Sequence, residues 1–153
     1  MESLIDRLAA RCGRFEGSGR NHENEDFVCR VGIVSVAEGN GVRLTFLATS
    51  IDKSQVFHCE EGLLANDMAG ATTYYPVSNN IPFVCPHSVV EIDSVLNMSV
   101  GDQDDQSTFR ELISLRFEGM DDIVYTYSWG LPGEDFDVKS SVRVSRFNSQ
   151  STD

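Results

Sequence analysis

The chain has 153 residues, of which 41% are hydrophobic, so it suits one domain with a buried core and is not a disordered chain. No apolar run approaches the roughly 20 residues that a membrane span needs. The formal net charge of -12 repels nucleic acid and anionic membranes, so we expect neither as a partner. Residues 1–11 contain two acidic residues and no unbroken apolar segment, which is unlike a signal peptide, and we expect a cytoplasmic protein.

A short amphipathic helix is predicted at the N-terminus. Ser3 followed by Asp6 resembles a capping box, in which each side chain accepts a hydrogen bond from the other residue's backbone N–H. Apolar residues then recur at helical spacing, at positions 4, 5, 8 and 12. We predict that this helix ends before Gly13 and packs across an open end of a sheet.

A glycine-rich run at 13–19 follows, with Phe15 as its one large apolar residue. Its glycines at 13, 17 and 19 let a strand bend sharply and let other backbone approach closely. We predict that this run is the first strand of a barrel and that Phe15 closes one end of it.

From residue 26 onward the hydrophobic pattern has the period of two that is typical of strands. Alternating apolar positions predict a hairpin of strands at 27–33 and 42–49, joined by a turn at 38–41. Further strands are predicted at 55–65, 72–77, 90–98, 109–117, 123–129 and 136–146. Residues 76–86 contain three prolines, which predict a surface loop or a strand edge.

The count is one helix and about nine or ten strands, joined by short turns without a helical crossover. Sequential hairpins favour a meander, and closing the meander removes its exposed strand edges. The predicted fold class is therefore all-β: a closed antiparallel up-and-down barrel of about 8–10 strands, with the short helix covering one end. We predict a single domain at 1–147 and a frayed polar tail at 148–153.

Several short motifs resemble those of the calycin superfamily, which includes lipocalins, fatty-acid-binding proteins and nitrobindin-like barrels. A Gly-x-aromatic motif at 13–15 opens the first strand, and Arg146 stands where these barrels place a basic residue across it. The His-x-Glu-x-Gly run at 58–62 is similar to an element of nitrobindin-like barrels. Phe-Arg-Glu at 109–111 and Tyr-Ser-Trp-Gly-Leu-Pro-Gly at 127–133 resemble uncharacterised bacterial lipocalin-like domains. The resemblance implies a calycin-like barrel that holds a small ligand.

The last strand carries the predicted partner of Phe15. Its alternation predicts Val138 and Arg146 on the apolar face, with Lys139 on the opposite face. We expect Arg146, or Arg143 if a bulge shifts the register, to stack over the Phe15 ring. This structural role in closing the barrel is favoured over the binding of a ligand carboxylate.

Haem is the cofactor that the resemblance raises, because haem-binding nitrobindins carry a proximal histidine near their C-terminal strands. This chain has no histidine after His87, so we predict no cofactor and disfavour haem. No metal site is predicted, because the four cysteines include no Cys-x-x-Cys pair. The acidic run at 102–105 also lacks the glycine and glutamate of an EF-hand loop. Cys29 lies among strand residues and is predicted to be a buried free thiol.

A barrel of this size encloses one small ligand when its interior is hollow, and the strand pattern turns a set of side chains inward. The predicted ligand-binding residues are Glu111, Tyr125, Tyr127, Trp129, His58, Glu60 and Phe46. A buried carboxylate such as Glu111 must be paired, hydrogen-bonded or protonated. It either orients a polar group of the ligand, or pairs with Arg146 or another internal base, or is turned outward by a bulge. His58 and Glu60 share a face and form either a proton-transfer pair or a structural hydrogen bond, whereas the aromatic row forms either core or pocket wall.

Three hypotheses for the function remain open. The favoured one is intracellular binding of a small apolar or amphipathic molecule by a monomer or homodimer. The second is an isomerase or lyase that uses His58, Glu60 or Glu111 as acid or base, although no residue is assigned as catalytic. The third is a ligand-free barrel that acts through its acidic surface. His22 and His87 are predicted to lie in loops, and the motifs of standard hydrolases, nucleotide-binding proteins and metalloproteases are missing.

Overall fold

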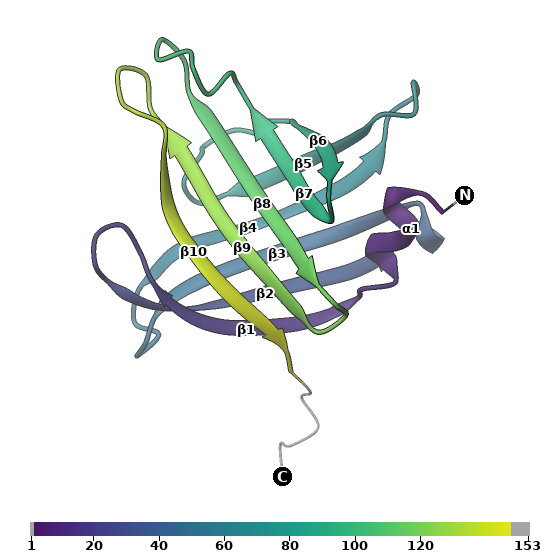
Figure 1. Ribbon diagram of the computed structural model, residues 1–153, viewed down its shortest axis with the longest axis horizontal. Helices are drawn as coiled ribbons and strands as arrows, with labels where there is room; N and C mark the ends of the chain where they lie inside the picture. Colours follow the sequence, from purple (N-terminus) through teal and green to yellow (C-terminus); the bar gives the residue numbers. More distant parts are fainter. Residues whose placement is uncertain (1, 148–153) are drawn as a thin grey trace.

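The computed structural model describes residues 2–147, so the polar tail predicted at 148–153 lies outside the described residues. The helices and strands, in chain order, are α1 (Leu4–Ala9), β1 (Gly13–Arg20), β2 (Asp26–Val36), the 3-10 turn η1 (Ala37–Gly39), β3 (Gly41–Ser50), β4 (Val56–Asn66), β5 (Thr72–Ser78), β6 (His87–Ile92), β7 (Val95–Val100), β8 (Arg110–Glu118), β9 (Asp122–Gly130) and β10 (Asp137–Arg146). Consecutive strands pair antiparallel, and β1 also pairs with β10, which closes the barrel (Figure 1). The predicted all-β, closed up-and-down barrel with one short N-terminal helix is confirmed.

The helix α1 packs against β2 and β3 at one end of the barrel (Figure 1). Ser3 and Asp6 form the capping box, since the Asp6 N–H donates to Ser3 Oγ and the Ser3 N–H donates to the Asp6 carboxylate, each over 3.1 Å. Ile5 and Leu8 point into the core. The helix ends at Ala9, earlier than its apolar spacing predicts, because the next N–H groups bond three residues back in a tight turn.

The first and last strands meet at the same end of the barrel. The Arg146 guanidinium lies over the Phe15 ring, 4.7 Å from its centroid, and Nη1 donates to the Cys12 carbonyl over 2.7 Å. Gly17 is needed for this closure, because a Cβ there would lie 2.0 Å from the Arg143 carbonyl oxygen. Phe15 and Arg146 therefore hold the α1 end of the barrel closed.

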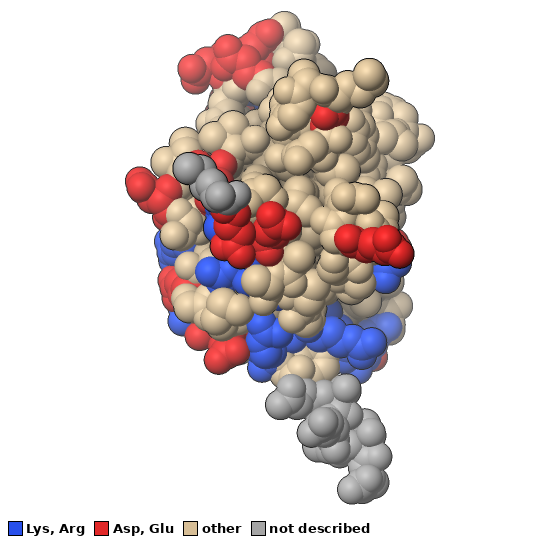
Figure 2. Space-filling model, turned by 90° about the vertical axis from the view of Figure 1, so that its right-hand side faces the viewer, with Lys and Arg blue, Asp and Glu red and all other residues tan. Residues whose placement is uncertain are grey.

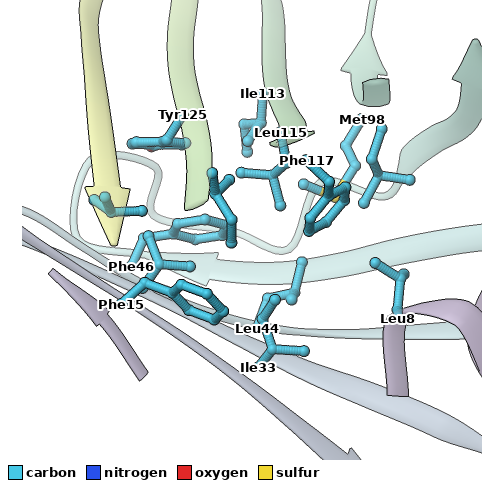
Figure 3. Close-up of a cluster of buried hydrophobic side chains, with 14 of the residues drawn as sticks. Leu8, Phe15, Ile33, Leu44, Phe46, Met98, Ile113, Leu115, Phe117 and Tyr125 are labelled. Carbon is cyan, nitrogen blue, oxygen red and sulfur yellow. The ribbon is translucent and has the colours of Figure 1, made fainter. Parts of the chain in front are cut away.

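The half of the barrel next to α1 is filled with apolar side chains (Figure 3). Leu8 of α1 faces Ile33 and Leu44, and inward residues of β7 and β8 pack above them. Phe46 and Tyr125 belong both to this cluster and to the lining of a cavity beyond it, and their rings stack at 4.9 Å. These two rings therefore separate the filled half of the barrel from the hollow half.

The single strand predicted at 90–98 is in fact a hairpin. Asp93 and Ser94, with φ of 51° and 66°, form the two-residue turn between β6 and β7. Because the turn has two residues, inward positions are odd-numbered in β6 and even-numbered in β7. Val90, predicted to share a face with Met98, is 53% exposed, whereas Met98 is buried.

The last strand contains a bulge near its start, and Arg146 rather than Arg143 still lies over Phe15. The register with β9 shifts between Val138 and Ser140, so the two sides of the strand exchange there. Val138 is 59% exposed, which contradicts its predicted place on the apolar face. Lys139, predicted on the opposite face, lies instead against the ring of Trp129, with Nζ 4.4 Å from the ring centroid.

Candidate functional site

The end of the barrel opposite α1 contains a cavity of about 390 Å³. This volume corresponds to roughly a dozen waters of bulk liquid, and it lies within the range of small-molecule sites. Its mouth is formed by loop residues that include Glu25, Asn80, Phe109 and Leu131. The interior is therefore accessible from the loops that join the strands at this end.

Aromatic side chains form much of the cavity wall. The Phe, Tyr and Trp residues that line the cavity are Phe27, Phe46, Phe57, Phe109, Tyr125, Tyr127 and Trp129. The Tyr125 and Tyr127 rings are stacked with their centroids 6.4 Å apart, which extends the Phe46–Tyr125 stack along the wall. Such a wall suits a planar apolar ligand, because aromatic rings pack favourably in offset stacks.

The structure brings most of the predicted ligand-binding residues to one place. Six of them line the cavity: Glu111, Tyr125, Tyr127, Trp129, His58 and Phe46. Glu60 lies just behind the wall and is 2% exposed. Cys29 also lines the cavity, and burial raises the pKa of its thiol to about 12, so it stays a neutral thiol. Phe15 and Arg146, assigned to barrel closure, lie at the other end.

A buried polar cluster borders the cavity and continues behind its wall; it is made of His58, Glu60, Tyr74, His87, Glu111 and Tyr127. Its first half comes from β4 and β5. The Tyr74 hydroxyl donates to Glu60 Oε2 over 2.7 Å, and His58 Nε2 lies 3.4 Å from Glu60 Oε1. Neither His58 Nε2 nor Glu60 Oε1 forms a hydrogen bond of good geometry among the described residues.

The positions of the β4 side chains explain the His-x-Glu-x-Gly run at 58–62. His58, Glu60 and Gly62 all point into the barrel, because alternate residues of β4 share a face. A Cβ at Gly62 would lie 2.3 Å from the Tyr74 ring, so only glycine leaves room for that ring. Gly62 thereby lets Tyr74 reach Glu60.

The second half of the polar cluster comes from β6, β8 and β9. Glu111 accepts a hydrogen bond from the Tyr127 hydroxyl over 2.8 Å and lies 2.7 Å from His87 Nε2. The prediction that His87 lies in a loop is wrong: it is the first residue of β6 and is fully buried. The missed turn between β6 and β7 explains the error, because it sets which residues of β6 point inward. His22 does lie in a loop, at the rim of the cavity.

The hydrogen bonds of His87 place a proton between it and Glu111. His87 Nδ1 lies 2.6 Å from the Cys85 carbonyl, which can only accept, so Nδ1 carries hydrogen. Nε2 faces Glu111 Oε1, and a hydrogen bond between them needs one further proton, either on Nε2 or on the carboxyl. The pair of His87 and Glu111 is therefore neutral overall and holds a proton next to the cavity.

His58 has a defined tautomer as well. The Asn80 amide nitrogen lies 3.1 Å from His58 Nδ1 and donates to it, so the hydrogen of a neutral imidazole is on Nε2, facing Glu60. Burial, followed by the charge of Glu60, raises the pKa of Tyr74. Burial, followed by the charge of Glu111, raises the pKa of Tyr127. Both phenols thus remain hydrogen-bond donors to their carboxylates.

The sequence analysis missed the residue that holds the cavity mouth together. Arg110 is fully buried, and its guanidinium donates to four backbone carbonyls of two loops. These belong to Gln103 and Thr108 in the β7–β8 loop and to Leu131 and Glu134 in the β9–β10 loop, with distances from 2.7 to 3.3 Å. The sequence offered one signal, an arginine directly before the inward-facing Glu111.

The histidine inside the cavity is not placed to bind a haem iron. Of the histidines that line the cavity, His58 has Nδ1 bonded to Asn80 and Nε2 buried against Glu60, so neither nitrogen is presented to a ligand. His22 lies at the rim, with Nε2 3.8 Å from Glu23. Within residues 2–147, no group of three or more His, Cys, Asp or Glu side chains is arranged to hold a metal ion.

No protein-family model matches the chain, and no curated protein matches it either. The crystal structure of Rv2717c from M. tuberculosis is similar, with a TM-score of 0.68 and 12% identity over 97% of this chain and 100% of that chain. A de novo designed fluorescence-activating β-barrel aligns with a TM-score of 0.44 and 11% identity, over 89% of this chain and 93% of the design. The similarity to Rv2717c shows a shared fold, and the closed ten-strand barrel fits a calycin-like fold. Within residues 2–147, no helix has the length and apolar character needed to cross a membrane.

Proposed function

We propose that the barrel binds a small hydrophobic or amphipathic molecule in the cavity opposite α1. The observation that carries this proposal is the division of the interior: the α1 half is filled, whereas the other half contains a cavity of about 390 Å³. The wall is aromatic, and a few polar groups, Glu111, Tyr127 and His58, converge at one side. An apolar pocket with a small number of placed polar groups is the usual form of a small-molecule site.

Binding inside the barrel is tested by filling the cavity. Ala48 lines it, so Ala48→Trp places a large ring in the space that a ligand needs. We expect the uncharged fluorescent probe N-phenylnaphthylamine to bind the wild-type protein in a one-to-one complex. Ala48→Trp should weaken this binding by about tenfold or more, since most of the contact surface is lost.

The matched control for this experiment is Thr49→Trp. Thr49 is the next residue of β3 and lines a shallow groove on the outside of the barrel with Val28 and Arg30. We expect this variant to bind the probe as the wild-type protein does, with circular dichroism showing that both variants are folded. Equal binding by Ala48→Trp and the wild-type protein would place the probe on the outer surface and contradict the proposal.

We propose proton transfer as a second candidate function, supported by the proton held between His87 and Glu111. Glu111 lines the cavity, whereas His87 lies behind it and balances the charge. In this arrangement Glu111 removes a proton from a carbon next to a ligand carbonyl and returns a proton to the same molecule. This is the chemistry of an isomerase that interconverts keto and enol forms.

Deuterium exchange tests this second candidate. Beta-tetralone is a bicyclic ketone with acidic C–H groups, and its exchange in D2O is followed by proton NMR. We expect the wild-type protein to accelerate the exchange and Glu111→Gln to reduce the acceleration by about a hundredfold, the usual scale of a general base. Glu61→Gln, on the exposed face of β4, is the control and should leave the rate unchanged. An unaccelerated reaction would remove this candidate without affecting the binding proposal.

A further inference from the structure

Acidic residues dominate the loops around the cavity mouth. Five loops meet at that end, at 21–25, 51–55, 79–86, 101–109 and 131–136. They contain eight acidic residues, which are two in 21–25, one in 51–55, three in 101–109 and two in 131–136, against the single lysine Lys53. Arg110 and Lys139 add positive charge at the same end, but the acidic residues outnumber the basic ones. A mouth with a net negative charge attracts cationic ligands and repels anionic ones.

The other end of the barrel differs in charge. Lys and Arg side chains gather on the lower half of the face at the α1 end (Figure 2). At the α1 end, Arg11 lies over the Phe117 ring, and Arg146 donates to the carbonyls of Cys12 and Met120. Arg11 and Arg146 are therefore basic groups away from the cavity mouth, whereas Arg110 and Lys139 lie at it.

The cavity offers an anionic ligand few basic side chains. Glu111 faces the cavity, and Glu60 lies behind the wall. Among the described lining residues, Lys139 is the one Lys or Arg, and it lies at the rim. A ligand that entered with a carboxylate first would pass the Lys139 ammonium at the rim and then meet the Glu111 carboxyl group inside.

The aromatic wall already holds a cation at its rim. The Lys139 ammonium lies 4.4 Å above the Trp129 ring, in the geometry of a cation–π contact, and its closest carboxylate, that of Asp137, is 4.0 Å away. An ammonium group on a ligand would find the same kind of contact with the inner rings, Phe46 and Tyr125, next to the polar cluster that includes Glu111.

We propose that the ligand of this cavity is an arylalkyl amine, an aromatic ring system that carries an alkylammonium group. This inference rests on the proposed binding function and specifies its ligand class. The ring of the amine lies against the aromatic wall, and its ammonium group points toward the polar cluster. The negative potential at the mouth attracts this ammonium group. Fatty acids and other carboxylates are disfavoured by the same charges.

Three probes with one ring system and different charges test the ligand class: naphthylmethylamine, naphthylmethanol and naphthylacetate. Their dissociation constants are measured by isothermal titration calorimetry at neutral pH. We expect the amine to bind about tenfold or more tightly than the acetate, with the alcohol between them. If N-phenylnaphthylamine binds but the acetate equals or exceeds the amine, the inference fails and the proposed function stands. If none of the four probes binds, both fail.

Lys139→Gln gives an independent test. The change removes the ammonium that occupies the rim, so we expect about threefold tighter binding of the amine and no tighter binding of the acetate. Lys53→Gln removes a lysine of the β3–β4 loop that does not line the cavity, and should alter the affinity for the amine much less. Weaker binding of the amine by Lys139→Gln would contradict the inference.

Discussion

Arg110 is a buried charge whose four hydrogen bonds all end on backbone carbonyls. Lysine cannot replace it, because a single ammonium on a flexible stem does not reproduce the planar fork that reaches two loops at once. A carbonyl left unpaired in a buried place costs free energy, and here several would be left unpaired together. The shape of the cavity mouth therefore depends on one side chain that does not itself line the cavity.

We predict that Arg110→Lys lowers the free energy of unfolding by about 3 kcal/mol or more, as expected for the loss of several hydrogen bonds to a charged donor. Urea unfolding measures the change. Arg116→Lys is the matched control, because Arg116 lies on the same strand with a side chain 54% exposed and pairs with Glu118 on the surface. It should change the stability by less than about 0.5 kcal/mol. Equal effects of the two variants would show that the buried hydrogen bonds of Arg110 contribute little.

Single residues of the site differ in how far the sequence predicts them. Glu111 is predictable, because a carboxylate at an apolar position of a strand has to face a partner inside the protein. Its partner is not predictable, since His87 is 24 residues away and becomes inward-facing only through the turn at 93–94. The role of Arg110 is not predictable for a related reason. Its hydrogen-bond acceptors are backbone carbonyls of loops, and every residue type has a backbone carbonyl.

At the level of strands, alternation predicts the face but not the register. The hairpins of β2–β3 and β8–β9 follow the predicted pattern, because uninterrupted alternation and glycine-containing turns define both partners. The turn at Asp93 and Ser94 lacks glycine and asparagine, so two non-glycine residues adopt positive φ without a sequence signal. The bulge near Lys139 also lacks a sequence signal, because one extra residue is not noticeable in a run of mixed polarity.

Both differences have consequences for the candidate site. The turn brings His87 into the polar cluster, and the bulge brings Lys139 to the cavity rim. The turn and the bulge each displace the in-and-out alternation of the strand by one residue. A displacement of one residue is enough to move a side chain to the other face of a sheet. The parts of the site that the sequence misses are thus those that depend on a local irregularity of a strand.

At the scale of the whole molecule, the barrel has two unlike halves, and the sequence does not distinguish them. Inward positions of β3 are apolar in both halves, yet Leu44 is packed in the core and Phe46 borders a cavity. Whether the space around an inward apolar side chain is filled depends on the side chains that all the other strands contribute. The prediction of a closed barrel therefore extends to the fold and not to the hollow interior.

The net charge of -12 is a property of the whole molecule that affects its stability. Electrostatic repulsion between like charges reaches across the barrel at low salt, where the Debye length is about 30 Å, and is confined to about 8 Å at physiological ionic strength. Surface ion pairs such as that of Arg30 and Glu16, with a distance of 2.9 Å, contribute little and are screened less by salt because the groups are in contact. Screening should therefore remove more repulsion than attraction.

We predict that raising the salt concentration from about 10 mM to about 150 mM NaCl increases the melting temperature, by about 3 °C for each 1 kcal/mol of repulsion removed. The double variant Asp104→Asn and Glu134→Gln tests whether repulsion is the cause. It makes the formal net charge less negative, from -12 to -10, by removing two carboxylates from the acidic loops at the mouth. Neither carboxylate accepts a hydrogen bond from the described residues, so the change removes charge without removing a contact. We expect the double variant to melt higher at low salt and to gain less from added salt. A melting temperature that falls with salt would show that the ion pairs, rather than the net repulsion, dominate the electrostatic free energy of the fold.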